Sequence, residues 1–363
     1  MSLTILNRLH KRAGPPALGP AIIAGLGCAL PLMLGLSTGH SGFWWVTLGA
    51  LLSAQATPLH RFGMLRMLTI TITGAISAGL GFWAASDALI SSVVFTAYGL
   101  LLAWLHRYGT EASKIGFSLA ICLCLGQGHF GAGNLHNPNA VAILFAIGGC
   151  WVMLLAFALR AIHGLRMWPY MPRFISILRV LQRHAQRLPA RQWRLHALAC
   201  ALAVGSSGVV VASAGLSHGY WLTIAVIATL QLEFSSSLAR SLLISLGSLS
   251  VAATLLLIGY SVQNPASLVM LTLPLVILSR ALHAKRYGVF VLQLSVCAML
   301  LTECLATDWQ TPLPRMLNSL IGMVLVMAIA LLMNTLYRQG LKFRRAAKRR
   351  QPITQPADTQ TEG

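Results

Sequence analysis

Acidic residues are scarce in this chain of 363 residues. It has 7 Asp and Glu residues against 27 Lys and Arg residues, and charged residues of both signs make up only 9% of the sequence. A soluble protein of this length carries roughly a quarter of its residues as charges. Because so few charges cannot cover a surface that faces water, the composition excludes an ordinary soluble domain.

The sequence also lacks the usual groups of catalysis and metal binding. No paired carboxylates occur for general acid–base work, and Cys122-Leu123-Cys124 has neither a zinc spacing nor a partner pair. We therefore expect no enzyme activity, no cofactor and no metal. The cysteines are interpreted as buried packing residues within apolar segments: Cys28, Cys122, Cys124, Cys150, Cys200, Cys297 and Cys304.

One glycine-rich run resembles a nucleotide-binding fingerprint. Residues 126–131 read Gly-Gln-Gly-His-Phe-Gly, but no strand of a βαβ unit precedes them and no acidic residue follows about 20 positions later. The run is interpreted as a flexible helix end.

Long apolar runs are what the sequence has instead. Hydrophobic residues make up 56% of it, and the mean hydropathy is +0.72. A bilayer-spanning helix needs about 20 apolar residues, so the chain is predicted to be an integral membrane protein. The predicted spans are 17–36, 42–57, 67–86, 88–105, 115–130, 139–159, 197–215, 219–232, 241–260, 266–282, 288–305 and 316–336.

Basic residues alternate between the loops of these spans. Lys and Arg gather in every second loop, while the opposite loops carry Asp87 and Asp308, with Arg315 as the exception. Because basic residues favour the cytoplasmic side, both termini are predicted to be cytoplasmic. The net charge of +20 is accordingly attributed to orientation and anionic lipid headgroups, not to nucleic acid.

The predicted fold is an all-α polytopic membrane protein of about 12 transmembrane helices in two parallel six-helix repeats. Each half has an even number of spans, so the repeats share one orientation. The expected divisions are a cytoplasmic N-terminus (1–16), a first six-span repeat (17–160), a basic cytoplasmic linker with an interfacial helix (161–196), a second six-span repeat (197–338) and a basic, disordered cytoplasmic tail (339–363).

A short motif occurs once in each half. Trp45-Val46-Thr47, with Gln55 eight residues later, returns as Trp221-Leu222-Thr223, with Gln231 eight residues later. Homologous halves of a membrane protein commonly build one pathway between them. The motif lies in the second span of each half, which is unusually short, and matched short spans indicate a binding site in repeat-built transporters.

Trp45, Gln55, Trp221 and Gln231 are therefore predicted to line a transport pathway. A polar amide inside a span needs a partner, which favours this role for the two glutamines. For the two tryptophans, an aromatic belt at the membrane interface is an equally good alternative.

Basic and titratable residues complete the candidate site. Arg66 and Arg240 follow the short spans and are candidates for binding an anion, because a guanidinium holds a carboxylate bidentately; orientation in the membrane is the alternative. Glu233, His106 and His283 are candidates for proton coupling. Their structural alternatives are an ion pair of Glu233 with Arg240 and capping of helix ends by the histidines.

The order Trp45–Gln55–Arg66–Gly74, repeated as Trp221–Gln231–Arg240–Gly247, resembles the fusaric acid resistance (FUSC) family. That resemblance covers roughly residues 15–160 and 196–338 and implies export of aromatic carboxylic acids. Two features depart from the family pattern. Neither glutamine is followed directly by proline, and the chain has only a short basic segment where larger members carry a cytoplasmic domain.

The sequence thus predicts an exporter of small, aromatic carboxylic acids in the bacterial inner membrane, with proton antiport as its first candidate mechanism. A passive anion channel and a non-transporting membrane scaffold are the alternatives. The expected partners are a small organic acid and anionic lipids at the basic linker and tail. A second copy of the chain is kept open as a partner, and nucleic acid is not expected.

Overall fold

The computed structural model describes residues 18–56, 59–60, 62–108, 110–128, 135–164, 183, 190–214, 216, 218–230, 270, 273–274, 276–277 and 312–350. All regular secondary structure in these ranges is helical. The helices are α2 (Leu18–Thr38), α3 (Gly42–Ser53), α4 (Gly63–Ala84), α5 (Ala88–Arg107), α6 (Thr110–Gly128), α7 (Pro138–Ile162), α9 (Ala190–Ala214), α10 (Tyr220–Thr229) and α14 (Pro312–Arg350).

Six of the described helices are long and apolar enough to cross a bilayer: α2, α4, α5, α7, residues Trp193–Ser213 of α9 and residues Met316–Met333 of α14. Shorter apolar helices are α3, α10 and the segment Ile115–Gly128 of α6. The chain is therefore a multi-pass membrane protein. Of the predicted spans, 241–260 and 288–305 lie outside the described residues, as does most of 266–282, so the number twelve stays a prediction.

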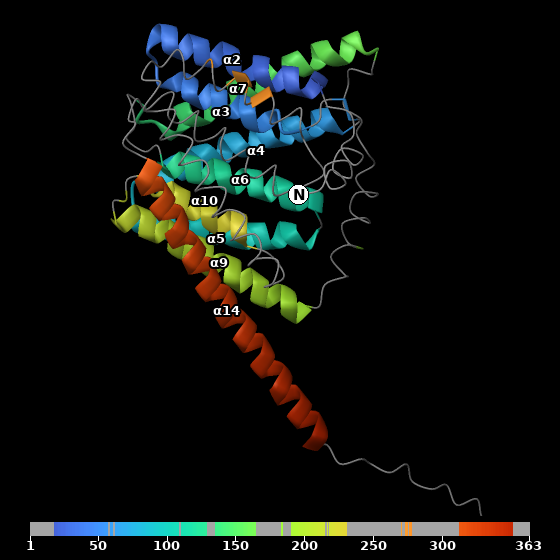
Figure 1. Ribbon diagram of the computed structural model, residues 1–363, viewed down its shortest axis with the longest axis vertical. Helices are drawn as coiled ribbons and strands as arrows, with labels where there is room; N and C mark the ends of the chain where they lie inside the picture. The colour runs from blue at the N-terminus through green and yellow to red at the C-terminus, as the bar shows by residue number, and fades with distance from the viewer. Residues whose placement is uncertain are drawn as a thin grey trace, which may run out of the picture.

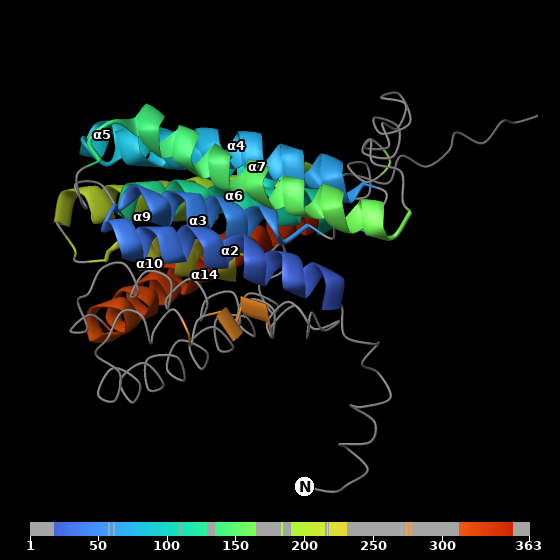
Figure 2. The ribbon, with the colours of Figure 1, turned by 90° about the horizontal axis from the view of Figure 1, so that it is seen from above.

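Figure 1 shows the helices stacked side by side, with α14 running obliquely across the stack and extending beyond it. Seen from above, α4, α5 and α7 lie along one side and α14 along the other (Figure 2). Large apolar side chains are exposed on several outer helices. Water would disfavour such a surface, whereas lipid matches it. The exposed apolar side chains include Ile22, Leu26, Ile72, Ile76, Leu89, Val93, Ile143, Leu154, Leu198 and Leu202.

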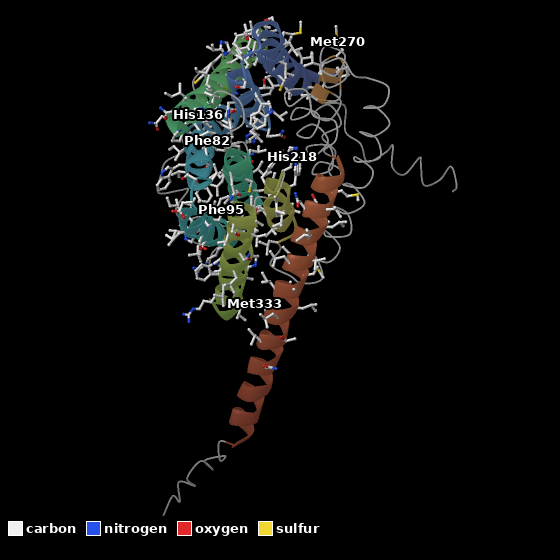
Figure 3. All side chains as sticks on the ribbon, turned by 90° about the vertical axis from the view of Figure 1, so that its left-hand side faces the viewer. Phe82, Phe95, His136, His218, Met270 and Met333 are labelled. Atoms are coloured by element: carbon white, nitrogen blue, oxygen red, sulfur yellow. The ribbon has the colours of Figure 1, made fainter. Side chains whose placement is uncertain are left out.

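The interior is filled by aromatic and small side chains. Phe82 of α4 and Phe95 of α5 are fully buried and lie within the helix stack (Figure 3). All of Trp44–Ser53 in α3 is buried, and in α10 only Ile224 is less than fully buried. The two short helices thus lie in the protein interior, away from lipid.

Side-chain caps begin two of the helices. Asp87 accepts a hydrogen bond from the Leu89 amide (2.7 Å) at the start of α5. Asn137 accepts one from the Asn139 amide (2.9 Å) at the start of α7, with Pro138 in the first turn. Such caps satisfy backbone donors that a helix leaves open. Asp87, one of the few acids in the chain, therefore has a local structural role.

Two predicted boundaries differ from the structure. Helix α9 begins at Ala190, inside the predicted linker, and α14 continues to Arg350, through residues predicted to be disordered. Both extensions consist largely of Ala, Arg, Lys, Gln and Leu, which favour helix, and no proline occurs between Arg315 and Gln351 to stop α14. Prediction from hydropathy alone ended each helix where the apolar residues end.

The glycine-rich run at 126–131 is also clarified in part. Residues 126–128 form the last residues of α6, and Gln127 is buried. This portion is an ordered, packed helix end rather than a flexible one, and 129–131 lie outside the described residues.

Candidate functional site

The repeated motif begins the two short buried helices. Trp45 and Thr47 lie in α3, a helix of 12 residues, and Trp221 and Thr223 lie in α10, a helix of 10 residues. Trp45 and Trp221 are 3% and 4% exposed. Tryptophans of a lipid-facing belt would show their rings on the outer surface, so the burial argues against the belt interpretation for both.

Each short helix packs against the last apolar helix of its half through a glycine. A Cβ atom on Gly148 of α7 would collide with the carbonyl of Val46, and one on Gly322 of α14 would collide with the carbonyl of Leu222. Val46 and Leu222 are the central residues of the repeated motif. Small residues let membrane helices approach closely, and here they do so at the same place in the motif.

The two threonines of the motif differ in their hydrogen bonding. Thr47 Oγ1 donates to the Phe43 carbonyl (2.8 Å) within α3. Thr223 Oγ1 and Trp221 Nε1 are buried and have no hydrogen-bond partner among the residues that the structure describes. A buried donor without a partner costs free energy, which makes this part of α10 a candidate place for a ligand.

The facing surfaces of α7 and α14 differ in polarity. Phe145, one turn before Gly148, is fully buried, whereas Asn318 and Ser319 are buried one turn before Gly322. These positions share a helix face with the glycine, since they precede it by three or four residues. The α10–α14 contact is therefore more polar than the α3–α7 contact.

A glutamine and two arginines lie near the end of α3 and the loop that follows it. Gln55 follows α3 in a turn, and its Nε2 donates to the Leu51 carbonyl (3.4 Å). Arg160 of α7 is only 5% exposed, and its Nη1 donates to the His60 carbonyl (3.3 Å) in the loop between α3 and α4. Arg66, in the first turns of α4, is half-buried. A buried guanidinium thus anchors the loop that joins the predicted pathway helix to Arg66.

A second polar cluster lies between α5 and α9. His106 Nδ1 and His196 Nε2 are 2.9 Å apart, and His196 Nε2 is 3.5 Å from Cys200 Sγ. His196 and Cys200 are buried, and His106 is half-buried. Beside them the Arg107 guanidinium lies 5.0 Å from the centre of the Trp193 ring, a cation–π contact.

A third polar cluster lies toward the opposite ends of these helices. Gln127 Nε2 donates to Ser91 Oγ (2.9 Å) and to the Gly208 carbonyl (3.1 Å). Ser91 Oγ donates to the same carbonyl (3.1 Å). These bonds join α5, α6 and α9, so Gln127 has a structural role in holding three helices together.

The predicted site residues are only partly described. Trp45, Gln55, Arg66, His106 and Trp221 lie in described segments, whereas Gln231, Arg240, Glu233 and His283 lie outside the described residues. Gln55 and Arg66 flank the loop that follows α3. His106, on α5, contacts His196 of α9 and so belongs to a separate cluster.

Several residues of the site were missed by sequence reasoning. In the sequence, Thr223 stands out only as part of the motif, and Arg160 is one of many basic residues at the ends of the predicted spans. His196 was not considered, although its spacing of four from Cys200 places both on one helix face. The Ile-Gly pairs at 147–148 and 321–322 were a detectable signal for the two packing glycines.

Comparison with known families supports the resemblance that the motif indicates. Residues 202–329 match the family described as fusaric acid resistance protein-like. The match falls in the second half of the chain and suggests a membrane transport or resistance protein, which fits a protein that is not an enzyme. No curated protein and no solved structure matches the chain.

Proposed function

We propose that the protein exports small organic acids, aromatic carboxylic acids in particular, along a pathway beside α10 and α14. The observation that carries this proposal is the pair of buried donors, Trp221 Nε1 and Thr223 Oγ1, that lack a partner among the described residues. They lie on the short helix of the half that matches the fusaric acid resistance protein-like family.

The chemistry of these donors suits a carboxylate. An indole N–H and a hydroxyl can each donate to a carboxylate oxygen, and hydrogen bonds to a charged group are stronger than neutral ones. The Trp221 ring, whose centroid is 5.5 Å from that of Tyr220, offers an aromatic surface against which a ring can pack. An aromatic acid would satisfy both kinds of contact.

The basic residues at the predicted cytoplasmic end would draw the anion in. Arg160 is buried there and Arg66 is half-buried; in this proposal Arg66 and Arg240 are the anion-binding residues of the two halves. In the sequence, Gln55 and Gln231 come between the motif tryptophans and these arginines. In this proposal the protein lies in the bacterial inner membrane, with both termini in the cytoplasm.

The proposal includes two six-span repeats. It is supported by the two matched helix pairs, α3 with α7 and α10 with α14, in which a glycine meets the carbonyl after the motif tryptophan. Repeat-built transporters form their pathway from both halves, and in this proposal the cargo passes beside α10 and α14.

Proton antiport is the mechanism to test first, with Glu233, His106 and His283 as candidate coupling groups. A passive anion channel is the second candidate. It is favoured by the absence of Asp and Glu from all six long apolar helices of the described residues, because intramembrane acids are the common proton carriers of pumps.

The deciding experiment uses inside-out vesicles that contain the protein and a preset pH gradient, followed with a pH-sensitive dye while aromatic and aliphatic acids are added. Export by antiport predicts that an aromatic acid collapses the gradient and that the Gln55→Ala/Gln231→Ala double variant does not. Gln339→Ala, at an exposed position of α14, is the matched control.

The other outcomes separate the alternatives. Anion flux that follows an imposed voltage, without proton movement, would replace antiport by a channel. If neither flux appears while the protein is present at normal membrane levels, export is wrong and a membrane scaffold, which fails on truncation after Gln339, becomes the better account.

A further inference from the structure

We propose that His106, His196 and Cys200 bind a d10 metal ion, Cu(I) or Zn(II), between α5 and α9. The side chains come from two helices, and their ligand atoms all lie within 4.8 Å of one another. Among the residues that the structure describes, this is the one group of three or more such side chains close enough to share an ion. The site does not depend on the proposed export function, and a metal ion bound to His106 would leave Glu233 and His283 as the candidate coupling groups.

The packing of α5 against α9 explains why the three side chains meet. Gly99 of α5 lies on the backbone carbonyl of Cys200, where a Cβ atom would collide with it. The helices run in opposite directions, so His106, two turns after Gly99, lies beside His196, one turn before Cys200. The Trp193 indole, which donates to the Ala103 carbonyl (3.4 Å), reinforces the contact between these residues.

Two of the three distances between ligand atoms are close to those of a metal site. With metal–nitrogen bonds of about 2.0–2.1 Å and metal–sulfur bonds of about 2.3 Å, tetrahedral ligands lie roughly 3.3 Å (N···N) and 3.6 Å (N···S) apart. His196 Nε2 is 3.5 Å from Cys200 Sγ and 2.9 Å from His106 Nδ1. The sulfur is already at ligand distance from His196, and the imidazoles need to separate by about 0.4 Å to exchange their hydrogen bond for a shared metal ion. His106 and the sulfur, which lie within 4.8 Å of one another, need to approach to about 3.6 Å.

The donor set selects soft metal ions. A thiolate with two imidazoles suits copper and zinc, whereas magnesium and calcium prefer oxygen ligands. Binding replaces the thiol proton: the S–H bond breaks, a metal–sulfur bond forms, the proton leaves to solvent and no oxidation state changes. Both imidazoles bind as neutral ligands through Nδ1 of His106 and Nε2 of His196.

Burial favours the monovalent ion. His196 and Cys200 are 6% and 0% exposed. One thiolate and two neutral imidazoles balance the charge of Cu(I) and leave a charge of +1 with Zn(II). An uncompensated charge is costly at this depth, so Cu(I) is expected to bind more tightly. The Arg107–Trp193 pair beside the site adds a further positive charge that opposes a divalent ion.

The test titrates the purified full-length protein in detergent with Cu(I), and separately with Zn(II), in competition with a chelator of known affinity. The expected result is one ion per chain, bound at least 100-fold more weakly in Cys200→Ser and in His106→Gln, since losing a ligand exceeds the roughly 10–100-fold loss from outer contacts. Cys150→Ser is the matched control, because Cys150 is exposed on α7.

X-ray absorption at the metal edge supplies a readout independent of affinity. The proposal predicts one sulfur and two imidazole nitrogens around the ion and loss of the sulfur in Cys200→Ser. Size-exclusion profiles identify a variant that fails to fold, and His106→Gln, on the other helix, then carries the test. The site would be overturned if neither ion bound in competition with the chelator, if both ligand variants bound the ion as tightly as the unchanged protein, or if the bound ion had no sulfur ligand.

Discussion

The α3–α7 and α10–α14 pairs share one packing plan and differ in what fills it. In both, a glycine lies on the carbonyl after the motif tryptophan. In the first pair Gly49 of α3 also lies on the Phe145 carbonyl of α7, so each helix places a glycine against the backbone of the other. The corresponding place in α10, four residues after the motif tryptophan, holds Ala225.

The difference indicates a division of labour. In the first pair, Phe145 is fully buried and Thr47 donates a hydrogen bond within its own helix. The second pair buries Asn318 and Ser319, together with the donors of Trp221 and Thr223 that have no described partner. Tight apolar packing favours a rigid support. Buried hydrogen-bond donors without a described partner favour contact with cargo. We therefore expect changes in the first pair to act on stability and changes in the second to act on transport.

The largest effect is expected from Gly148→Ala. Its methyl group would collide with the Val46 carbonyl and the Ala50 amide, and because backbone cannot move aside, the loss of stability is expected at or above the upper end of the about 1–3 kcal/mol of overpacking. Gly322→Ala, which meets one carbonyl, is expected to cost less.

Thermal unfolding in detergent measures both variants. Gly19→Ala is the control, because its methyl group would meet only side chains, Leu159 at 3.3 Å and Leu59 at 3.9 Å. Equal melting temperatures for Gly148→Ala and Gly19→Ala would remove the basis for calling the first pair the rigid support.

The two helix pairs also differ at the C-terminal ends of α7 and α14. Helix α7 ends near a buried arginine that bonds the loop after α3, whereas α14 continues to Arg350. Arg160→Gln removes a charged donor and is expected to cost about 1.5–3 kcal/mol. Arg66→Gln, at a half-buried position, is expected to lower anion affinity with a smaller loss of stability.

Two measurements on both arginine variants separate these effects: the melting temperature reports stability, and the dependence of the transport rate on acid concentration reports anion affinity. A larger loss of stability in Arg66→Gln than in Arg160→Gln would contradict the assignment of Arg160 as the anchor of this loop.

Thr223→Val and Thr47→Val test the second pair with matched changes. Removing the Thr223 hydroxyl is expected to slow acid transport about tenfold, the loss of one hydrogen bond of about 1.4 kcal/mol to the cargo. Stability should stay equal or rise, because a buried group without a described partner is removed. Thr47→Val should lower the melting temperature slightly and leave transport nearly unchanged. The reverse pattern would exchange the roles of the two pairs.

Ala225→Gly is expected to have the smallest effect. It gives α10 the glycine that α3 has at the matching place, at a cost of about 0.5–1 kcal/mol from lower helix propensity. A melting temperature that rises would show that α10 and α14 gain from the closer approach seen in the first pair.

Much of the fold was predictable because hydropathy determines where helices cross a membrane. The predicted spans 17–36, 67–86 and 139–159 overlap α2, α4 and α7 almost completely, and the two short spans became the two short helices. The polar helix extensions at Ala190 and Arg350 were not predictable from hydropathy, since their residues favour helix without being apolar.

The site was less predictable, since its partners come from different helices. Sequence reasoning placed His106 at a helix end but gave no reason to join it to His196, 90 residues later. Likewise, nothing in the motif distinguishes Thr47, which bonds its own helix, from Thr223, which does not.

The sequence by itself determined that the chain crosses a membrane, where its apolar segments lie and that a motif occurs twice, because these follow from local composition and spacing. Only the tertiary structure decided which carbonyl each glycine meets, which donors remain open and which histidine faces Cys200. Those relations depend on how closely the helices approach and on how they are rotated, and both result from packing many side chains at once.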